Sequence, residues 1–117
     1  MIVEDDLDAM KIASAAVRAA GYEVVQAYGG KDALRKLRLH QIDLVLTDLA
    51  MPEMSGVEVI AAIKSDPKTQ HIPIIVTTAF VWDQFAQSAA QAGCDGFVAK
   101  PVRKDVLIRE IEKHLKK

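Results

Sequence analysis

The stretch Ile42-Asp43-Leu44-Val45-Leu46-Thr47-Asp48 is an almost unbroken apolar run with an acid at its C-terminal end. Strands that are apolar on both faces are typical of parallel sheets, because helices cover both faces of such a sheet. A second run of the same kind, Ile74-Ile75-Val76-Thr77-Thr78, follows later in the chain. Both runs are therefore predicted to be buried strands, with Asp48 and Thr78 at their C-terminal ends.

The segments between the apolar runs show the periodicity of helices. Apolar residues recur every three or four positions within residues 8–20, 31–39, 56–64 and 82–92, and again after Pro101. In the first of these segments the apolar positions are Ala9, Ile12, Ala13, Ala16, Val17 and Ala20. Gly21 and Gly93 follow two of the segments, as C-terminal caps do. Each segment is predicted to be a helix with one face toward the core.

Three shorter apolar runs complete the pattern, at residues 1–3, 23–27 and 96–99. Five strands thus alternate with five helices through short connections. This alternation predicts an α/β three-layer sandwich, with helices on both faces of a parallel sheet. The length of 117 residues suits one domain, 1–117, and leaves no room for a second.

The composition excludes several classes of function. There are 15 Lys and Arg against 16 Asp and Glu, a net charge of -1, so no nucleic-acid partner is expected. No apolar run approaches membrane-spanning length and no leader pattern opens the chain, so we expect a cytoplasmic protein without a membrane partner. The single cysteine, Cys94, has no partner for an internal disulfide and is predicted to be a buried structural thiol.

The chemistry is expected where the predicted strands end. Sites in open parallel sheets form outside the carboxyl ends of the strands. There the chain carries Glu4, Asp5, Asp48, Thr78 and Lys100. Clustered carboxylates repel one another unless a cation neutralises them, and Mg²⁺ accepts one or two carboxylates, waters and a phosphate. This set of groups predicts phosphoryl transfer, with Asp48 as the nucleophile and an aspartyl phosphate as the product.

Across essentially its whole length the chain resembles the receiver domain of bacterial two-component response regulators. Four segments in order carry the resemblance: Val3-Glu4-Asp5-Asp6, residues 43–52 with Ser55-Gly56, residues 73–79, and Gly93 to Pro101. The resemblance implies a flavodoxin-like fold, (βα)5, with a five-stranded parallel sheet of order 2-1-3-4-5. It also implies that Lys100-Pro101 is a cis peptide bond.

The resemblance implies a role for each site residue. Asp48 would be the phosphoacceptor, and Thr78 and Lys100 would contact the phosphoryl oxygens with the amides of Ala50 and Ala79. Mg²⁺ would be held by Asp5, by Asp48 and by the carbonyl of Ala50, with Glu4 reaching it through water.

The resemblance further implies a switch. Thr78 would move toward the phosphoryl group and the Phe97 ring would turn inward behind it, altering the surface of the fourth helix, fifth strand and fifth helix. A plain core role for Phe97 remains the alternative. Ala50 and Phe80 occupy the two positions near the attacking water, and neither holds water by a side-chain hydrogen bond. Slow self-dephosphorylation is therefore expected.

The expected phosphodonor is a sensor histidine kinase or a histidine phosphotransfer protein. The domain would act as a switch, not as an enzyme on other substrates, either by binding a partner or by relaying phosphate. It would be a monomer or a phosphorylation-dependent dimer. The short segment before Glu4 leaves open a natural single-domain regulator or a part of a larger protein such as a hybrid kinase.

Three other classes fit less well. A haloacid-dehalogenase-type phosphatase would carry an acid where this chain has Ala50, and a cap for which the chain is too short. A pseudo-receiver would lack the acceptor, an acid or the lysine. A flavodoxin would have a Ser-, Thr- and Gly-rich first loop, whereas Glu4-Asp5-Asp6 would repel phosphate.

Overall fold

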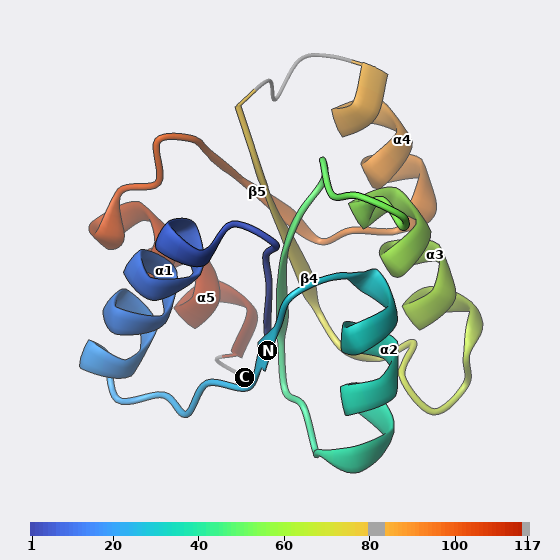
Figure 1. Ribbon diagram of the computed structural model, residues 1–117, viewed down its shortest axis with the longest axis horizontal. Helices are drawn as coiled ribbons and strands as arrows, with labels where there is room; N and C mark the ends of the chain where they lie inside the picture. The colour runs from blue at the N-terminus through green and yellow to red at the C-terminus, as the bar shows by residue number, and fades with distance from the viewer. Residues whose placement is uncertain (80–83, 116–117) are drawn as a thin grey trace.

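The computed structural model describes residues 1–79 and 84–115 and contains five strands and five helices in alternation (Figure 1). The strands are β1 (Ile2–Val3), β2 (Gln26–Ala27), β3 (Val45–Asp48), β4 (Ile74–Thr78) and β5 (Gly96–Ala99). The helices are α1 (Leu7–Ala19), α2 (Gly30–Leu39), α3 (Gly56–Ser65), α4 (Gln84–Ala92) and α5 (Lys104–Leu115).

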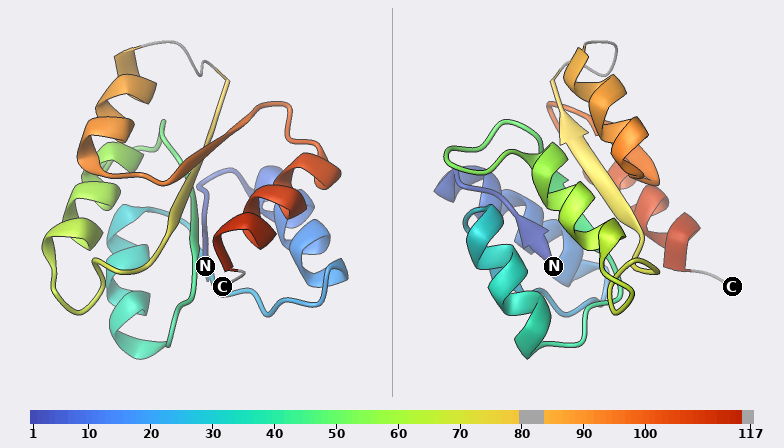
Figure 2. Two further views of the ribbon diagram at one scale, coloured as in Figure 1. Left: turned by 180° about the vertical axis from the view of Figure 1, so that it is seen from behind. Right: turned by 90° about the vertical axis from the view of Figure 1, so that its right-hand side faces the viewer.

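All five strands form one parallel sheet in the order β2-β1-β3-β4-β5. Helices α1 and α5 cover one face, and α2, α3 and α4 cover the other (Figures 1 and 2). This three-layer arrangement and strand order confirm the predicted flavodoxin-like fold. Within the described residues, no helix combines the length and apolar character needed to cross a membrane.

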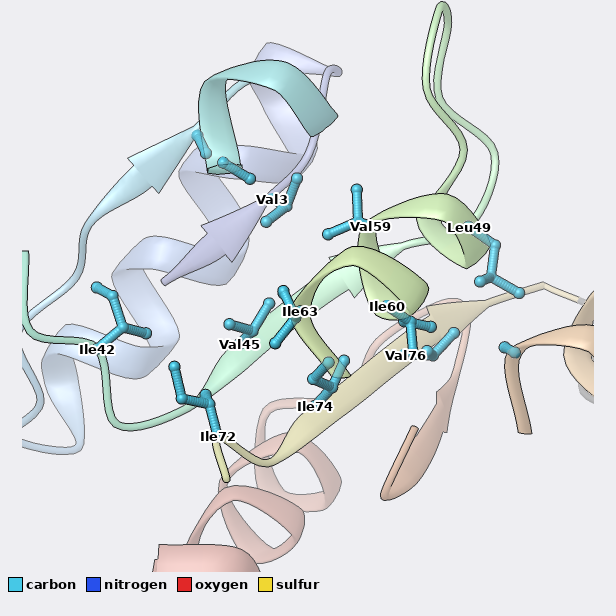
Figure 3. Packing of buried hydrophobic residues seen from close by; sticks show 13 residues of the cluster. Val3, Ile42, Val45, Leu49, Val59, Ile60, Ile63, Ile72, Ile74 and Val76 are labelled. Atoms are coloured by element: carbon cyan, nitrogen blue, oxygen red, sulfur yellow. The ribbon is translucent and has the colours of Figure 1, made fainter. Parts of the chain in front are cut away.

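Strand alternation divides the core between the two faces. Val45, Ile74 and Val76 pack with α3 residues on the face covered by α2, α3 and α4 (Figure 3). Leu46 and Ile75, one position along, pack with α1 and α5 residues on the opposite face. The central strands β3 and β4 are buried throughout, which explains their unbroken apolar sequence.

Short-range signals fix the helix ends. The Asp6 side chain caps α1 by accepting from the Ala9 amide at 3.1 Å. Ser55 and Glu58 form a reciprocal capping box at the start of α3. Gly21, which follows the C-cap Ala20 of α1, and Gly93, which follows α4 directly, take φ values of 96° and 110°, which confirms that they end these helices as predicted.

Several details differ from the sequence-based expectations. Strand β2 begins later than predicted, because β1 has only two residues to pair with it. Strand β3 begins at Val45, which pairs with Ile74, the first residue of β4. The prediction that Ile12 faces the core is wrong: Ile12 is 68% exposed, since Met10, Ser14 and Val17 form the buried stripe of α1. Cys94 is half-buried rather than buried. The predicted start of α4 at Trp82 lies outside the described residues.

Candidate functional site

Three carboxylates meet at the carboxyl ends of β1 and β3. Glu4 and Asp5 directly follow β1, and Asp48 ends β3, whose register pairs Val3 with Thr47. One carboxylate oxygen from each of Glu4, Asp5 and Asp48 lies within 4.8 Å of the others. The acids that the sequence places at separate strand ends therefore form one cluster.

The Asp48 carboxylate is held from both sides. Its Oδ1 accepts a hydrogen bond from the Leu49 amide at 2.8 Å, and its Oδ2 lies 3.1 Å from the Lys100 ammonium. The residue is only 8% exposed. The carboxylate is thus oriented by its own backbone and partly neutralised by a lysine, as a positioned nucleophile would be.

Lys100 reaches the cluster from the end of β5. Its ammonium also lies 3.7 Å from Glu4 Oε1, so one cation faces two of the three acids. The peptide bond from Lys100 to Pro101 is cis, as expected.

Glu4 is the most buried acid of the cluster, with 6% of its surface exposed. Its Oε2 accepts from the Asp6 amide at 3.2 Å. Burial raises the pKa of the Glu4 carboxyl above its usual range, and the Asp6 amide opposes this in part. The ionised form is therefore costly here unless further positive charge is present.

The donor set suits a hard divalent cation. Asp5 is exposed, whereas Glu4 and Asp48 are buried, so an ion among them would keep access to water on one side. Among the described residues, the three carboxylates face the Lys100 ammonium alone, which leaves excess negative charge for such an ion to balance. Ala50 is exposed two residues after Asp48, and its carbonyl remains a predicted ligand.

Gly56 determines how closely α3 approaches the acceptor strand. A Cβ on Gly56 would lie 2.2 Å from the Asp48 carbonyl oxygen and 2.8 Å from Leu49 Cα. The Gly56 amide donates to the Leu49 carbonyl at 2.8 Å. Gly56 belongs to the Ser55-Gly56 motif, but no role for it was predicted from the sequence. The signal was present, since glycine directly follows the Ser55 cap where another residue would favour the helix.

The two switch candidates lie on one face of the sheet. Phe97 pairs with Val76 and packs against the core cluster covered by α2, α3 and α4, and Thr78 follows Val76 by two positions on the same strand. Thr78 is 7% exposed and pairs with Ala99, which precedes Lys100. Phe97 is half-buried. Its switching role and its plain core role both remain predictions, and Phe80 lies outside the described residues.

A sequence profile of the response regulator receiver domain matches residues 1–112. The polar-differentiation response regulator DivK of Brucella anthropi is 37% identical over 115 residues, which cover 98% of this chain and 94% of that protein.

Two solved structures share the fold closely. Chemotaxis protein CheY4 of Vibrio cholerae superposes with a TM-score of 0.92 at 27% identity, covering 97% of this chain and 95% of that one. The receiver domain of sensor histidine kinase PA1611 from Pseudomonas aeruginosa PAO1 has a TM-score of 0.92 at 26% identity, covering 99% and 95%. That structure has a magnesium ion coordinated in its active-site cleft.

Proposed function

Because the chain belongs to the response regulator receiver domain family, we propose that Asp48 accepts a phosphoryl group and that this modification switches the domain between two signalling states. The observation that carries the proposal is the Asp48 carboxylate held between the Leu49 amide and the Lys100 ammonium, beside Glu4 and Asp5. A nucleophile, a lysine and an oxygen-rich metal site are the parts that phosphoryl transfer requires.

In the proposed reaction, a carboxylate oxygen of Asp48 attacks the phosphorus of a phosphohistidine. The P–O bond forms as the P–N bond breaks, the imidazole leaves, and an acyl phosphate remains on Asp48. Lys100 moves from the carboxylate toward the phosphoryl oxygens and offsets their charge. Asp5, Asp48 and the Ala50 carbonyl would hold Mg²⁺, with Glu4 reaching it through water, and the ion would supply further positive charge for the transferring group.

The response is proposed to run through Thr78 and Phe97. The Thr78 hydroxyl turns toward the new dianion, and the Phe97 ring occupies the space behind it. The altered surface comprises α4, β5 and α5, where a partner protein reads the state or a phosphotransfer protein receives the phosphate. We assign the donor to a histidine kinase or histidine phosphotransfer protein in the cytoplasm, and the domain's catalysis to its own phosphorylation and dephosphorylation alone.

The test is an intact-mass measurement after incubation with acetyl phosphate, with Mg²⁺ or with chelator. We expect the mass of one phosphoryl group to be gained only with Mg²⁺ and to be absent from Asp48→Asn. The matched control is Asp43→Asn, an exposed acid five positions earlier in the same segment, which should gain the group normally. An unmodified wild type under every condition would reject the proposal and point to a constitutive binding module.

A further inference from the structure

The loop of residues 49–55 joins β3 to α3 and carries Ala50, the predicted metal ligand two positions after Asp48. The base of this loop is closed by the Gly56 amide, which donates to the Leu49 carbonyl at 2.8 Å. Ala50 itself is exposed, so its position depends on how the rest of the loop is held.

The far side of the loop packs against the first residue of α2, Gly30. A Cβ on Gly30 would lie 2.7 Å from both Cγ and Sδ of Met54 and 2.8 Å from its Cβ. The Met54 side chain also packs against the core cluster that α2, α3 and α4 cover. Figure 2, right, shows the green loop above the start of α2. The missing side chain of Gly30 therefore provides the room in which Met54 lies.

The backbone of α2 does not explain a glycine at this position. Gly30 lies within the helix, whereas the glycines with positive φ in the described part of the chain are Gly21 and Gly93. Alanine forms helices more readily than glycine, which loses more backbone freedom on folding. The close approach of Met54 is the feature that requires a residue without a Cβ here. The preceding Gly29 differs, since a Cβ there would have no atom within 4 Å.

The turn before Met54 is tight. Its amide donates to the Pro52 carbonyl at 2.7 Å, and Glu53 takes a φ of 66°, which is uncommon for a residue with a side chain. Such a conformation persists where neighbouring contacts hold it. Glu53 also lies 3.7 Å from the Lys31 ammonium, but both side chains are exposed and the pair contributes little. The packing of Met54 on Gly30 is thus the main contact between this turn and α2.

We propose that Gly30 and Met54 are positioning residues for the acidic site. Their contact holds the loop so that the Ala50 carbonyl reaches a Mg²⁺ ion bound by Asp5 and Asp48. This inference rests on the proposed function, in which Ala50 is a ligand. Mg²⁺ requires near-ideal octahedral geometry, so a small displacement of one carbonyl weakens its binding. The first turn of α2 thereby contributes to a site built on β1 and β3.

The test is a titration of ¹⁵N-labelled protein with MgCl₂, in which the amides of Asp5 and Leu49 report the Kd. Gly30→Ala should raise the Kd by roughly fivefold, because the new methyl group displaces Met54 and the loop with it. Gly29→Ala is the matched control at the adjacent residue and should keep the Kd within about twofold of the wild type.

Variants of Met54 test the other side of the contact. Met54→Ala should also raise the Kd by roughly fivefold, whereas Met54→Leu, which keeps the volume, should stay within about twofold. The double variant Gly30→Ala with Met54→Ala should lose less than the product of the two single losses, because most atoms that the new methyl group would meet are gone. The amides of Ile74 and Asp95, at the other end of the strands, should keep their positions and report an intact fold.

The inference is overturned if Gly30→Ala binds Mg²⁺ as the wild type does, if Met54→Ala and Met54→Leu bind alike, or if the two losses multiply in the double variant. Should Gly30→Ala not fold, the comparison of the two Met54 variants decides. A wild type without saturable shifts overturns it too. A wild type that binds Mg²⁺ but gains no phosphoryl group from acetyl phosphate rejects the proposed function, and the Kd values of the variants still decide this inference.

Discussion

The Lys100 ammonium lies 3.1 Å from Asp48 Oδ2 and 3.7 Å from Glu4 Oε1, so a single cation links the acceptor to the most buried acid of the cluster. In the proposed reaction this cation is also the group that meets the incoming phosphoryl oxygens. The Lys100 ammonium therefore offsets carboxylate charge before phosphorylation and, in the proposed reaction, phosphoryl charge after it.

Lys100→Gln should slow phosphorylation by acetyl phosphate by roughly a hundredfold, because a positioned positive charge is lost from the transition state. The rate of mass gain measures the effect. Lys68→Gln, at an exposed lysine near the other end of the sheet, is the control and should react at the wild-type rate. Equal rates for the two variants would remove Lys100 from the mechanism.

Mg²⁺ should stabilise the folded domain through the cluster of Glu4, Asp5 and Asp48. At a concentration about 100 times Kd, the free energy of unfolding should rise by about 2.7 kcal/mol. Asp5→Asn should be more stable than the wild type in chelator, because carboxylate repulsion is reduced, and should lose most of the gain from Mg²⁺. Urea unfolding with and without Mg²⁺ checks both. A full Mg²⁺ effect in Asp5→Asn would place the ion elsewhere.

Glu4 should make stability fall with rising pH in the absence of metal. Because burial raises its pKa in the folded state, the folded protein retains a proton that the unfolded chain loses above about pH 4.3. This stabilising contribution is complete below that pH and is lost as pH rises through the folded-state value. Glu4→Gln should therefore gain stability over the wild type between about pH 4 and about pH 7.

Urea unfolding in chelator at both ends of this pH interval measures the difference for Glu4→Gln. Glu23→Gln, at an exposed glutamate, provides the comparison and should follow the wild type at both pH values. A constant difference between Glu4→Gln and the wild type would mean that Glu4 is not desolvated.

Gly56→Ala should destabilise the domain by about 2 kcal/mol or more, because the new methyl group meets the Asp48 carbonyl at 2.2 Å and neither backbone segment is free to retreat. Gly29→Ala is the matched change. A Cβ there has no atom within 4 Å and the backbone is extended, so its effect should stay within about 0.5 kcal/mol. Thermal or urea unfolding compares the two, and similar losses would argue against the close approach.

The phosphorylated protein should be long-lived, since Ala50 offers no side-chain hydrogen bond to an attacking water. Ala50→Asn should shorten the lifetime by roughly five- to tenfold, the rate effect of one added hydrogen bond in the transition state. Loss of the phosphoryl mass with time, after removal of acetyl phosphate, gives both lifetimes. A wild-type phosphoprotein that decays as fast as the variant would contradict the prediction.

The alternation of apolar strands and helices was sufficient to predict a parallel sheet with an acidic site at the strand ends, for local reasons, whereas the strand order followed from the family resemblance. Asp48 and Lys100 each end or follow an apolar strand, and parallel strands carry such residues to one edge of the sheet. The exposure of Ile12 was not predicted, because alanines spread around α1 obscure which stripe of the helix is buried. A cavity of about 440 Å³ between α1 and α5, lined by Ala13 and Leu107, was not predicted either, since it depends on the distance between two helices that are far apart in sequence.

At the opposite end of the strands, the side chain of Asp95 contacts several elements. Asp95 Oδ2 accepts from the Ile74 amide at 2.8 Å and lies 3.2 Å from the Lys64 ammonium, which also donates to the Ile72 carbonyl. These contacts join the start of β4, the segment before β5 and the end of α3, at the end of the sheet opposite the acids. The acids and this network therefore lie at opposite ends of the central strands, so a substitution among the acids leaves the contacts that join β4, β5 and α3 in place.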